Sequence, residues 1–362
     1  MDNDLQDKFA AALADFNRGR FDLALATSRQ LLAVQADYVP ALLVAGLAAR
    51  YTGDLASALA YLESAAGRGN DFQIWSAWGS TLKAAGQVER SKIVLQAAYR
   101  TQGLVIDRLE MDVAYACNLH CRGCSHYSNY ALKGHVSYEE GRQWLGDWSR
   151  RVVPQTFRML GGEPTLNPRL IEFLHFAREV WPLSRLELVS NGFFMDRHPG
   201  IYEALAATRT HLYITLHSAE ADYLDKVKPE RIREASATHG FGLSIDNGEP
   251  EDSFHALYRG EAETMRPFAD GNPLQSWRIC GEKLCPTLHQ GRLWKCPPIA
   301  FLGLVSDKFG LAANPEWQPY LQHQGLGLEA SDEDILAYVS QPGAICGMCP
   351  SKTVRAIDAA AM

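Results

Sequence analysis

The chain has 362 residues, of which 47% are hydrophobic and 21% are charged. This is the composition of an ordinary globular protein, and the length suffices for two well-packed domains and a smaller third one. With 35 basic and 42 acidic side chains, the formal net charge of −7 argues against a large nucleic-acid footprint, although a local basic patch would not show in this sum.

The N-terminal stretch MDNDLQDKFAAALADF begins with acidic side chains and lacks the basic segment and apolar core of a signal peptide. No apolar run reaches the roughly 18 residues that span a bilayer. We therefore expect a cytoplasmic protein with no membrane partner and no nucleic-acid partner. Because cytoplasmic thiols stay reduced, the eight cysteines predict metal or catalytic sites rather than disulfides.

Residues 1–103 are expected to be helical throughout, with Pro40 as the internal breaker. Two sets of small residues recur at intervals of 34 and 33: Gly19, Gly53 and Gly86, and two turns earlier Ala12, Gly46 and Gly79. Small residues let paired helices approach closely, and the later glycines turn the chain back, as in stacked helical hairpins. The segment resembles about three tetratricopeptide repeats, which bind a peptide or partner protein or serve as a packing platform. An ordinary helical bundle with coincidental spacing is the alternative.

Residues 107–250 alternate between short strands and helices. The expected strands are 108–116, 157–160, 186–189, 212–216 and 241–245, and the expected helices are 137–152, 169–180, 201–207 and 222–237. This rhythm predicts a parallel sheet, either open or curled towards a barrel. Polar or glycine-rich groups follow each strand: a cysteine loop, Gly161-Gly162-Glu163-Pro164, Ser190-Asn191-Gly192, His217-Ser218 and Asp246-Asn247. Such groups meet at one edge of a parallel sheet and mark its active face.

The cysteine loop, ACNLHCRGCSHYS (116–128), holds Cys117, Cys121 and Cys124 in a C-x3-C-x2-C pattern. A structural zinc site needs four ligands, so His120 or His126 would have to complete it. A redox dithiol would use Cys121 and Cys124 and leave Cys117 without a role. A four-iron cluster held by three thiolates has one open iron that can bind a substrate or cofactor, so three cysteines are then the requirement.

The third interpretation is also where the chain resembles a known family. C-x3-C-x2-C after the first strand, followed by MLGGEPTL (159–166) after the second, is similar to the paired motifs of radical S-adenosylmethionine enzymes. The resemblance covers roughly 107–250. It implies a partial (β/α)6 barrel and a 4Fe-4S cluster on Cys117, Cys121 and Cys124 that binds S-adenosylmethionine. In that family reductive cleavage of this cofactor yields a 5′-deoxyadenosyl radical, which abstracts hydrogen from the substrate.

Further cofactor contacts follow from the same resemblance, residue by residue. The GGEP motif implies that Gly161, Gly162, Glu163 and Pro164 hold the methionine end, while Ser190, Asn191, His217 and Ser218 follow the next two strands. One position departs from the family pattern, because Gly123 stands where many members carry an aromatic residue near the adenine. His126 or Tyr127 would supply that surface, with ordinary loop packing as the alternative.

The C-terminal segment holds five more cysteines: Cys280, Cys285, Cys296, Cys346 and Cys349. Their spacing resembles the SPASM and twitch domains of radical S-adenosylmethionine enzymes, and the shorter twitch type implies one auxiliary 4Fe-4S cluster. Such a cluster takes four thiolates, so Cys280 and Cys285 compete for the fourth place beside the other three. An all-cysteine zinc site is the alternative.

The expected architecture is therefore α/β with three parts. These are tetratricopeptide-like helical repeats at 1–103, a radical S-adenosylmethionine partial barrel at 107–270, and a small cysteine-rich iron–sulfur domain at 271–362. Candidate proton-transferring residues between the strand ends and the C-terminal part are His217, Asp246, Glu249 and His289.

Two functional hypotheses follow. The first is a maturase that oxidises, cross-links or epimerises a peptide or protein recruited by the repeats; the second is an oxidoreductase acting on a sugar, aminocyclitol or nucleotide-type molecule. Either would need an electron donor such as flavodoxin or ferredoxin. A third hypothesis is a non-catalytic scaffold whose clusters are structural. It is disfavoured because a three-thiolate site followed by GGEP has little purpose without the cofactor.

Overall fold

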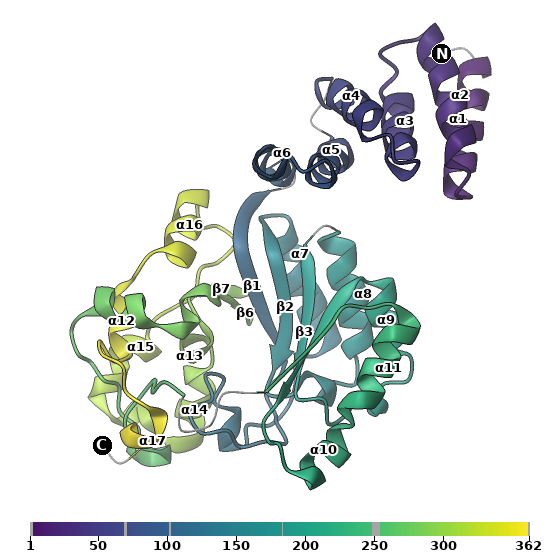
Figure 1. Ribbon diagram of the computed structural model, residues 1–362. Coiled ribbons are helices and arrows are strands. Elements are labelled where there is room, and N and C mark those ends of the chain that lie inside the picture. The colour runs from purple at the N-terminus through teal and green to yellow at the C-terminus, as the bar shows by residue number, and fades with distance from the viewer. Residues whose placement is uncertain (1–2, 69–70, 101–102, 183, 248–253, 361–362) are drawn as a thin grey trace. The chain divides into compact units, whose positions relative to one another are not determined.

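A computed structural model describes the chain except for residues 1–2, 69–70, 101–102, 183, 248–253 and 361–362 (Figure 1). The chain folds into two compact units, Met1–Val105 and Ile106–Met362. Within the described residues, no helix is both long and apolar enough to cross a membrane.

The first unit is a row of helices in which each packs against the next. Their bounds are α1 Asn3–Asn17, α2 Phe21–Val34, α3 Val39–Tyr51, α4 Leu55–Ala66, α5 Phe72–Ala84 and α6 Val88–Arg100. A Cβ atom at Gly46 would lie 2.5 Å from Cγ of Leu62, so the absence of a side chain there allows α3 and α4 to approach closely. The same holds for Gly79 of α5 against Leu95 of α6, at 2.6 Å. The close approach expected from the sequence period is confirmed, while the likeness to tetratricopeptide repeats stays a prediction.

The second unit is built on one seven-stranded sheet with the order β5-β4-β3-β2-β1-β6-β7. The strands are β1 Leu104–Ala114, β2 Val152–Gly161, β3 Arg185–Ser190, β4 Thr210–Leu216, β5 Leu243–Asn247, β6 Thr287–His289 and β7 Arg292–Trp294. The pairs β2–β3, β3–β4, β4–β5 and β1–β6 are parallel, and β6–β7 is an antiparallel hairpin. The expected α/β class with a parallel sheet and a helical N-terminal region is confirmed.

Helices α7 to α11 connect the parallel strands, and in Figure 1 α8, α9 and α11 lie along one side of the sheet. Their bounds are α7 Tyr138–Ser149, α8 Leu170–Val180, α9 Ile201–Ala207, α10 Ala221–Val227 and α11 Pro229–His239. The stretch around 222–237 is helical as expected, and it divides into α10 and α11 because the chain breaks at Lys228, whose φ is 52°. Pro229 causes the break, since its ring disfavours a helical conformation at the preceding residue and it has no N–H to donate.

The C-terminal part packs on the other side of the sheet in Figure 1. Its helices are α12 Pro273–Ile279, α13 Pro297–Ala300, α14 Leu302–Phe309, α15 Gln318–Leu321, α16 Asp332–Ser340 and α17 Ala356–Ala359. A buried core that includes Phe301, Trp317 and Met348 also takes in Tyr127 of the cysteine loop. This core therefore anchors the cysteine loop to the C-terminal part. A domain boundary near residue 270 remains a prediction.

Candidate functional site

A cavity of about 680 Å³ opens where the parallel strands end. Its lining brings together three cysteines of one loop with residues that follow the next three strands: Cys117, Cys121, Cys124, Gly161, Gly162, Ser190, Asn191 and His217. These groups come from sequence segments up to 100 residues apart. Parallel strands place their carboxyl ends at one edge of the sheet, which explains why the segments meet.

Two glycines let the end of β2 pack directly against the backbone that enters the cysteine loop. A Cβ atom on Gly161 would lie 2.3 Å from the carbonyl oxygen of Ala114, and one on Gly162 would lie 2.3 Å from that of Ala116. In this close contact the Gly162 N–H donates to Ala114 O over 2.8 Å, and the Glu163 N–H donates to Ala116 O over 2.9 Å. The glycine pair therefore sets the spacing between the two loops.

The Glu163 carboxylate is completely buried and points into the protein rather than into the cavity. It accepts hydrogen bonds from the Thr165 backbone N–H at 3.1 Å, the Ser190 hydroxyl at 2.7 Å and the Asn191 N–H at 2.8 Å. Burial raises the pKa of Glu163, and these donors act in the opposite direction. The side chain thus joins the loop after β2 to the end of β3, and a cofactor would meet the loop's backbone.

The cysteine loop is also joined to β3 and β4. The Asn191 amide donates to Asn118 Oδ1 over 2.8 Å and lies 3.9 Å from the Cys117 sulfur. Cys121 Sγ lies 3.4 Å from His217 Nδ1. Asn118 could not be predicted from its local sequence, because its role depends on a contact across 73 residues.

The structure explains why position 123 is glycine. Gly123 has a φ of +80°, and a Cβ atom there would lie 2.7 Å from Cβ of Ala356 and 3.1 Å from Cβ of Phe254. An aromatic side chain does not fit in this space. Phe254, which sequence analysis missed, instead lines the cavity.

His126 and Tyr127, the two alternatives for that aromatic surface, take different positions. His126 lines the cavity, and its Nδ1 lies 2.7 Å from Asp112 Oδ2. Although burial opposes the charge, the Asp112 carboxylate raises the pKa of His126 to about 10. Tyr127 is buried outside the cavity lining, where its hydroxyl donates to Pro298 O over 3.2 Å.

Several other predicted site residues lie outside the cavity lining. Pro164 is buried at the start of a short 3-10 turn, and Ser218 accepts the Glu220 N–H over 3.1 Å. Asp246 is exposed at the end of β5. His289 is buried against Tyr115 and Phe301, and this burial lowers its pKa to about 4. Glu249 lies outside the described residues.

The donor set at the cysteine loop fits an iron–sulfur cluster. All three sulfurs line one cavity, and burial raises the pKa of Cys117 to about 11, so its thiolate needs a bound cation. In the part of the chain that the structure describes, no three His, Cys, Asp or Glu side chains are placed to hold a single metal ion. A four-iron cluster binds each thiolate through a different iron, so its ligands need not converge on one point.

The five C-terminal cysteines separate into two groups. Burial raises the pKa values of Cys280, Cys296 and Cys349, and nearby thiols raise them further: Cys280 and Cys349 act on Cys296, and Cys346 acts on Cys280 and Cys349. Cys296, Cys346 and Cys349 pack against the same apolar core. Cys285 instead faces the 680 Å³ cavity, where burial and then Glu110 raise its pKa. Within the described part of the chain, Cys280 is therefore electrostatically coupled to other cysteines of this group, and Cys285 is not among their partners.

The cavity also has a charged end that sequence analysis missed. It is lined by Arg108 and Glu110 of β1, Arg158 of β2, and Glu282 and Cys285 of the segment before β6. Arg108 and Glu110 are two residues apart on one strand and so share a face. Charged residues at alternate positions of a strand were the only sign of this cavity in the sequence. Such a pattern is common in exposed strands and does not by itself indicate a cavity.

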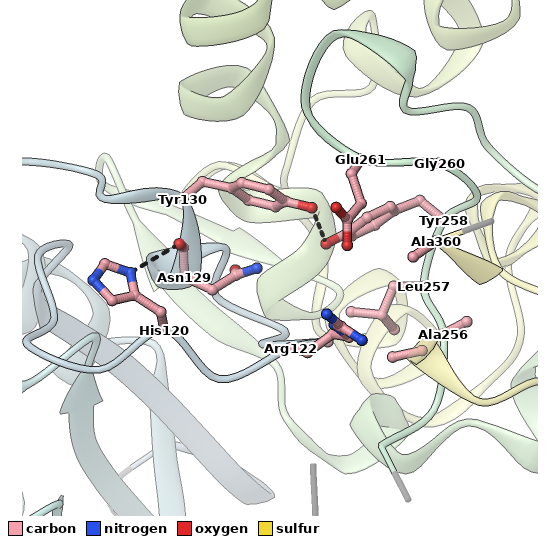
Figure 2. A pocket seen from close by; sticks show the side chains of 12 residues that line it. His120, Arg122, Asn129, Tyr130, Ala256, Leu257, Tyr258, Gly260, Glu261 and Ala360 are labelled. Atoms are coloured by element: carbon pink, nitrogen blue, oxygen red, sulfur yellow. Dashed lines mark hydrogen bonds between the residues drawn. The ribbon is translucent and has the colours of Figure 1, made fainter. Parts of the chain in front are cut away.

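A second cavity, of about 220 Å³, lies between the cysteine loop and residues 256–261 (Figure 2). Figure 2 shows the Tyr130 and Tyr258 hydroxyls pointing towards each other, 2.9 Å apart. It also shows Arg122 beside Leu257, and His120 bound to the Asn129 carbonyl at 3.1 Å. This cavity takes none of the three cysteines into its lining.

Comparison with known proteins gives a family match for the central part of the chain. Residues 111–256 match the Radical SAM superfamily. No curated protein matches the chain.

Among solved structures, the chain is similar to BtrN in complex with AdoMet and 2-DOIA, with 14% identity over 69% of this chain and 100% of that chain at a TM-score of 0.41. It is also similar to Streptococcus suis SuiB bound to S-adenosylmethionine, with 16% identity over 47% of this chain and 46% of that chain at a TM-score of 0.32. A third similar structure is anSMEcpe with bound AdoMet, with 18% identity over 38% of this chain and 42% of that chain at a TM-score of 0.30. Overall likeness at this level adds nothing to the assignment.

The assignment rests on the family match and on the motif residues within it. The match includes Cys117, Cys121 and Cys124 as well as the Gly161-Gly162-Glu163-Pro164 turn. The family implies a 4Fe-4S cluster and S-adenosylmethionine. The chain therefore carries a radical SAM domain at residues 111–256, and this domain indicates a radical SAM enzyme.

Proposed function

We propose that the chain cleaves S-adenosylmethionine reductively and uses the product to abstract hydrogen from a peptide or protein substrate, which is thereby oxidised, cross-linked or epimerised. The observation that supports the chemistry is the cavity in which Cys117, Cys121 and Cys124 face Gly161, Gly162 and Asn191. When bound, the cluster supplies an electron and S-adenosylmethionine supplies the hydrogen-abstracting group.

The chain's own residues would hold these groups in place. The three thiolates bind the cluster, and the loop after β2 presents backbone groups to the methionine end. Glu163 holds that loop against Ser190 and Asn191, because its carboxylate accepts donors from both. An electron donor such as flavodoxin or ferredoxin would supply the reductant.

A peptide or protein substrate is supported by the first unit, whose helices pack in sequence with the close contacts of stacked hairpins. Arrays of this kind present extended binding surfaces. A second candidate is a sugar, aminocyclitol or nucleotide-type molecule. It is favoured by the charged side chains at one end of the 680 Å³ cavity, which suit a small polar molecule.

The proposed auxiliary cluster would bind to Cys280, Cys296, Cys346 and Cys349. Because it would offer a second redox centre, it favours oxidation, cross-linking or epimerisation over simple isomerisation.

Anaerobic reconstitution tests the proposal. We expect about eight irons per chain, the content of two four-iron clusters, and release of 5′-deoxyadenosine under reduction that Cys121→Ala abolishes. A protein that binds zinc and almost no iron would contradict the proposal.

A further inference from the structure

The charged end of the 680 Å³ cavity contains a buried carboxylate, that of Glu110, one of whose two oxygens has no hydrogen bond within the described residues. Glu110 is only 2% exposed, and it lines the cavity seven residues before Cys117. Its Oε1 is buried and has no hydrogen-bond donor among the described residues. A buried polar atom without a partner costs about 1–3 kcal/mol, and more when the group is charged. Such an atom at a cavity wall indicates a missing partner.

The nearby arginines do not fill this need. Arg158 Nη1 lies 3.6 Å and Arg108 Nη1 lies 3.9 Å from Glu110 Oε1, so both are beyond hydrogen-bonding distance. Arg158 is held by Glu187, which accepts from its Nε at 3.0 Å and its Nη2 at 2.8 Å. The guanidinium therefore donates its hydrogen bonds to Glu187 and reaches Glu110 only as a longer ion pair.

The charges around Glu110 select the kind of ligand group that would fit. Glu282 adds a second carboxylate to the cavity lining, and burial raises the pKa of Glu110 to about 7. His126 and Arg158 act against this rise, but each is also paired with another carboxylate, His126 with Asp112 and Arg158 with Glu187. An anionic group that paired with Arg108 would lie beside both carboxylates and be repelled by them. A protonated amine carries three N–H donors and a positive charge, so it satisfies Oε1 and balances the carboxylates at once.

We propose that Glu110 is a substrate-binding residue that accepts a hydrogen bond from a protonated amine of the substrate. The inference rests on the proposed function, because it takes this cavity to hold the substrate beside the cofactor. The amine has two possible sources that share one chemistry: an amino-substituted sugar or cyclitol, or the lysine side chain of a peptide.

Matched pairs of probes test the proposal on the full-length, cluster-loaded protein with S-adenosylmethionine. The small-molecule arm compares glucosamine with N-acetylglucosamine, and the peptide arm compares acetyl-Ala-Lys-Ala-amide with its Nζ-acetylated form. Equilibrium dialysis measures the dissociation constants at pH 8. In the arm that matches the natural source, we expect the free amine to bind at least tenfold more tightly than its acetylated partner.

Glu110→Gln should remove this preference, because an amide offers no charge to the amine. Glu234→Gln, an exposed residue of α11, is the matched control and should keep it. If neither arm shows a preference for the free amine, or if Glu110→Gln retains it, the proposal is overturned. Release of 5′-deoxyadenosine is measured in the same preparations. Its persistence would leave the proposed function standing, and its absence would overturn both.

Discussion

The backbone N–H of Asn191 donates a hydrogen bond to the carboxylate of Glu163 over 2.8 Å, which ties the end of β3 to the loop that follows β2. The Ser190 hydroxyl binds the other oxygen of the same carboxylate at 2.7 Å. One buried acidic side chain therefore sets the relative positions of two loops that line the cofactor cavity.

Glu163→Gln should weaken both folding and cofactor binding. The substitution replaces one carboxylate oxygen by an NH₂ group, so either the Asn191 N–H or the donors from Ser190 and Thr165 lose an acceptor. Buried donors left unsatisfied cost about 1–3 kcal/mol. Urea unfolding and the dissociation constant of S-adenosylmethionine would measure the two effects. Glu203→Gln, an exposed residue of α9, serves as the control, and equal behaviour of the two variants would show that Glu163 has no such role.

Iron content should distinguish Cys280 from Cys285. Among the described residues, Cys280 acts electrostatically on Cys296 and Cys349, whereas Cys285 interacts with Glu110 and Arg108 and with none of the other cysteines that act on Cys280. We expect Cys285→Ala to keep about eight irons per chain and Cys280→Ala to fall to about four, the content of one cluster. The measurement is an iron assay after anaerobic reconstitution. The reverse order would make Cys285 the ligand.

The free energy of unfolding of the ligand-free protein should show how much the burial of the Glu110 carboxylate destabilises the fold. Burial raises its pKa from 4.5 to about 7; Glu282 acts in the same direction, while His126, Arg158 and a hydrogen bond with Cys285 act against it. A group whose pKa is raised on folding stabilises the protein below its unfolded value, and that stabilisation is lost as the pH rises through the folded value. Between pH 4.5 and pH 7 and above, the protein should therefore lose about 3 kcal/mol from this group.

Glu110→Gln removes this titration and keeps the size of the side chain. At pH 8 the variant should be more stable than the parent protein by up to about 3 kcal/mol, although it loses the amine preference. Urea unfolding from pH 5 to pH 8 measures the difference, with Glu234→Gln as the control. A variant that is less stable at pH 8 would mean that Glu110 has a structural partner.

Alanine substitutions at two glycines with left-handed backbone should distinguish the cost of backbone strain from the cost of a close contact. Gly123 has a φ of +80° and Ala356 close by, while Gly134 has a φ of +90° and no other atom within 4 Å of an added Cβ. Both alanine variants incur the cost of the left-handed conformation, about 1–2 kcal/mol. Gly123→Ala should lose at least about 1 kcal/mol more, because the Ala356 Cβ belongs to a short side chain that moves only with its backbone. Equal losses in urea unfolding would mean that α17 is free to shift.

Removal of residues 1–103 should distinguish the two substrate classes. If the helical unit recruits a peptide or protein, the shortened chain should lose affinity for its substrate and still release 5′-deoxyadenosine in an uncoupled reaction. That release is the control, since it shows that the second unit remains folded. Unchanged turnover would remove docking as the function of this unit and favour a small-molecule substrate.

Local patterns in the sequence were enough to predict the α/β class, the parallel strands and the helical N-terminal region. The strands at 212–216 and 186–189 fall within β4 and β3, because buried parallel strands are short apolar runs whose limits are set by neighbouring residues. The helical stretch expected around 222–237 divides into α10 and α11 before Pro229, a division that the helical pattern around it did not reveal.

The motif residues could be named from the sequence because the cluster's thiolates and the GGEP turn lie within short segments. What Glu163 binds could not be predicted, since its partners Ser190 and Asn191 are 27 and 28 residues away. The choice between Cys280 and Cys285 was equally closed to sequence reasoning. Cys280 fits the family spacing and Cys285 lies close enough in the sequence to replace it, so the choice depends on what surrounds each cysteine in the fold.

The sequence by itself determined which chemistry the protein performs, because three thiols and a glycine turn at fixed spacing carry that information locally. Only the tertiary structure decided what shares the cavity with them. Glu110, Arg158 and Cys285 come from three distant segments, and each resembles an ordinary residue in its own sequence context. Folding removes them from water together, and the loss of solvent makes an unpaired carboxylate costly enough to indicate a binding partner.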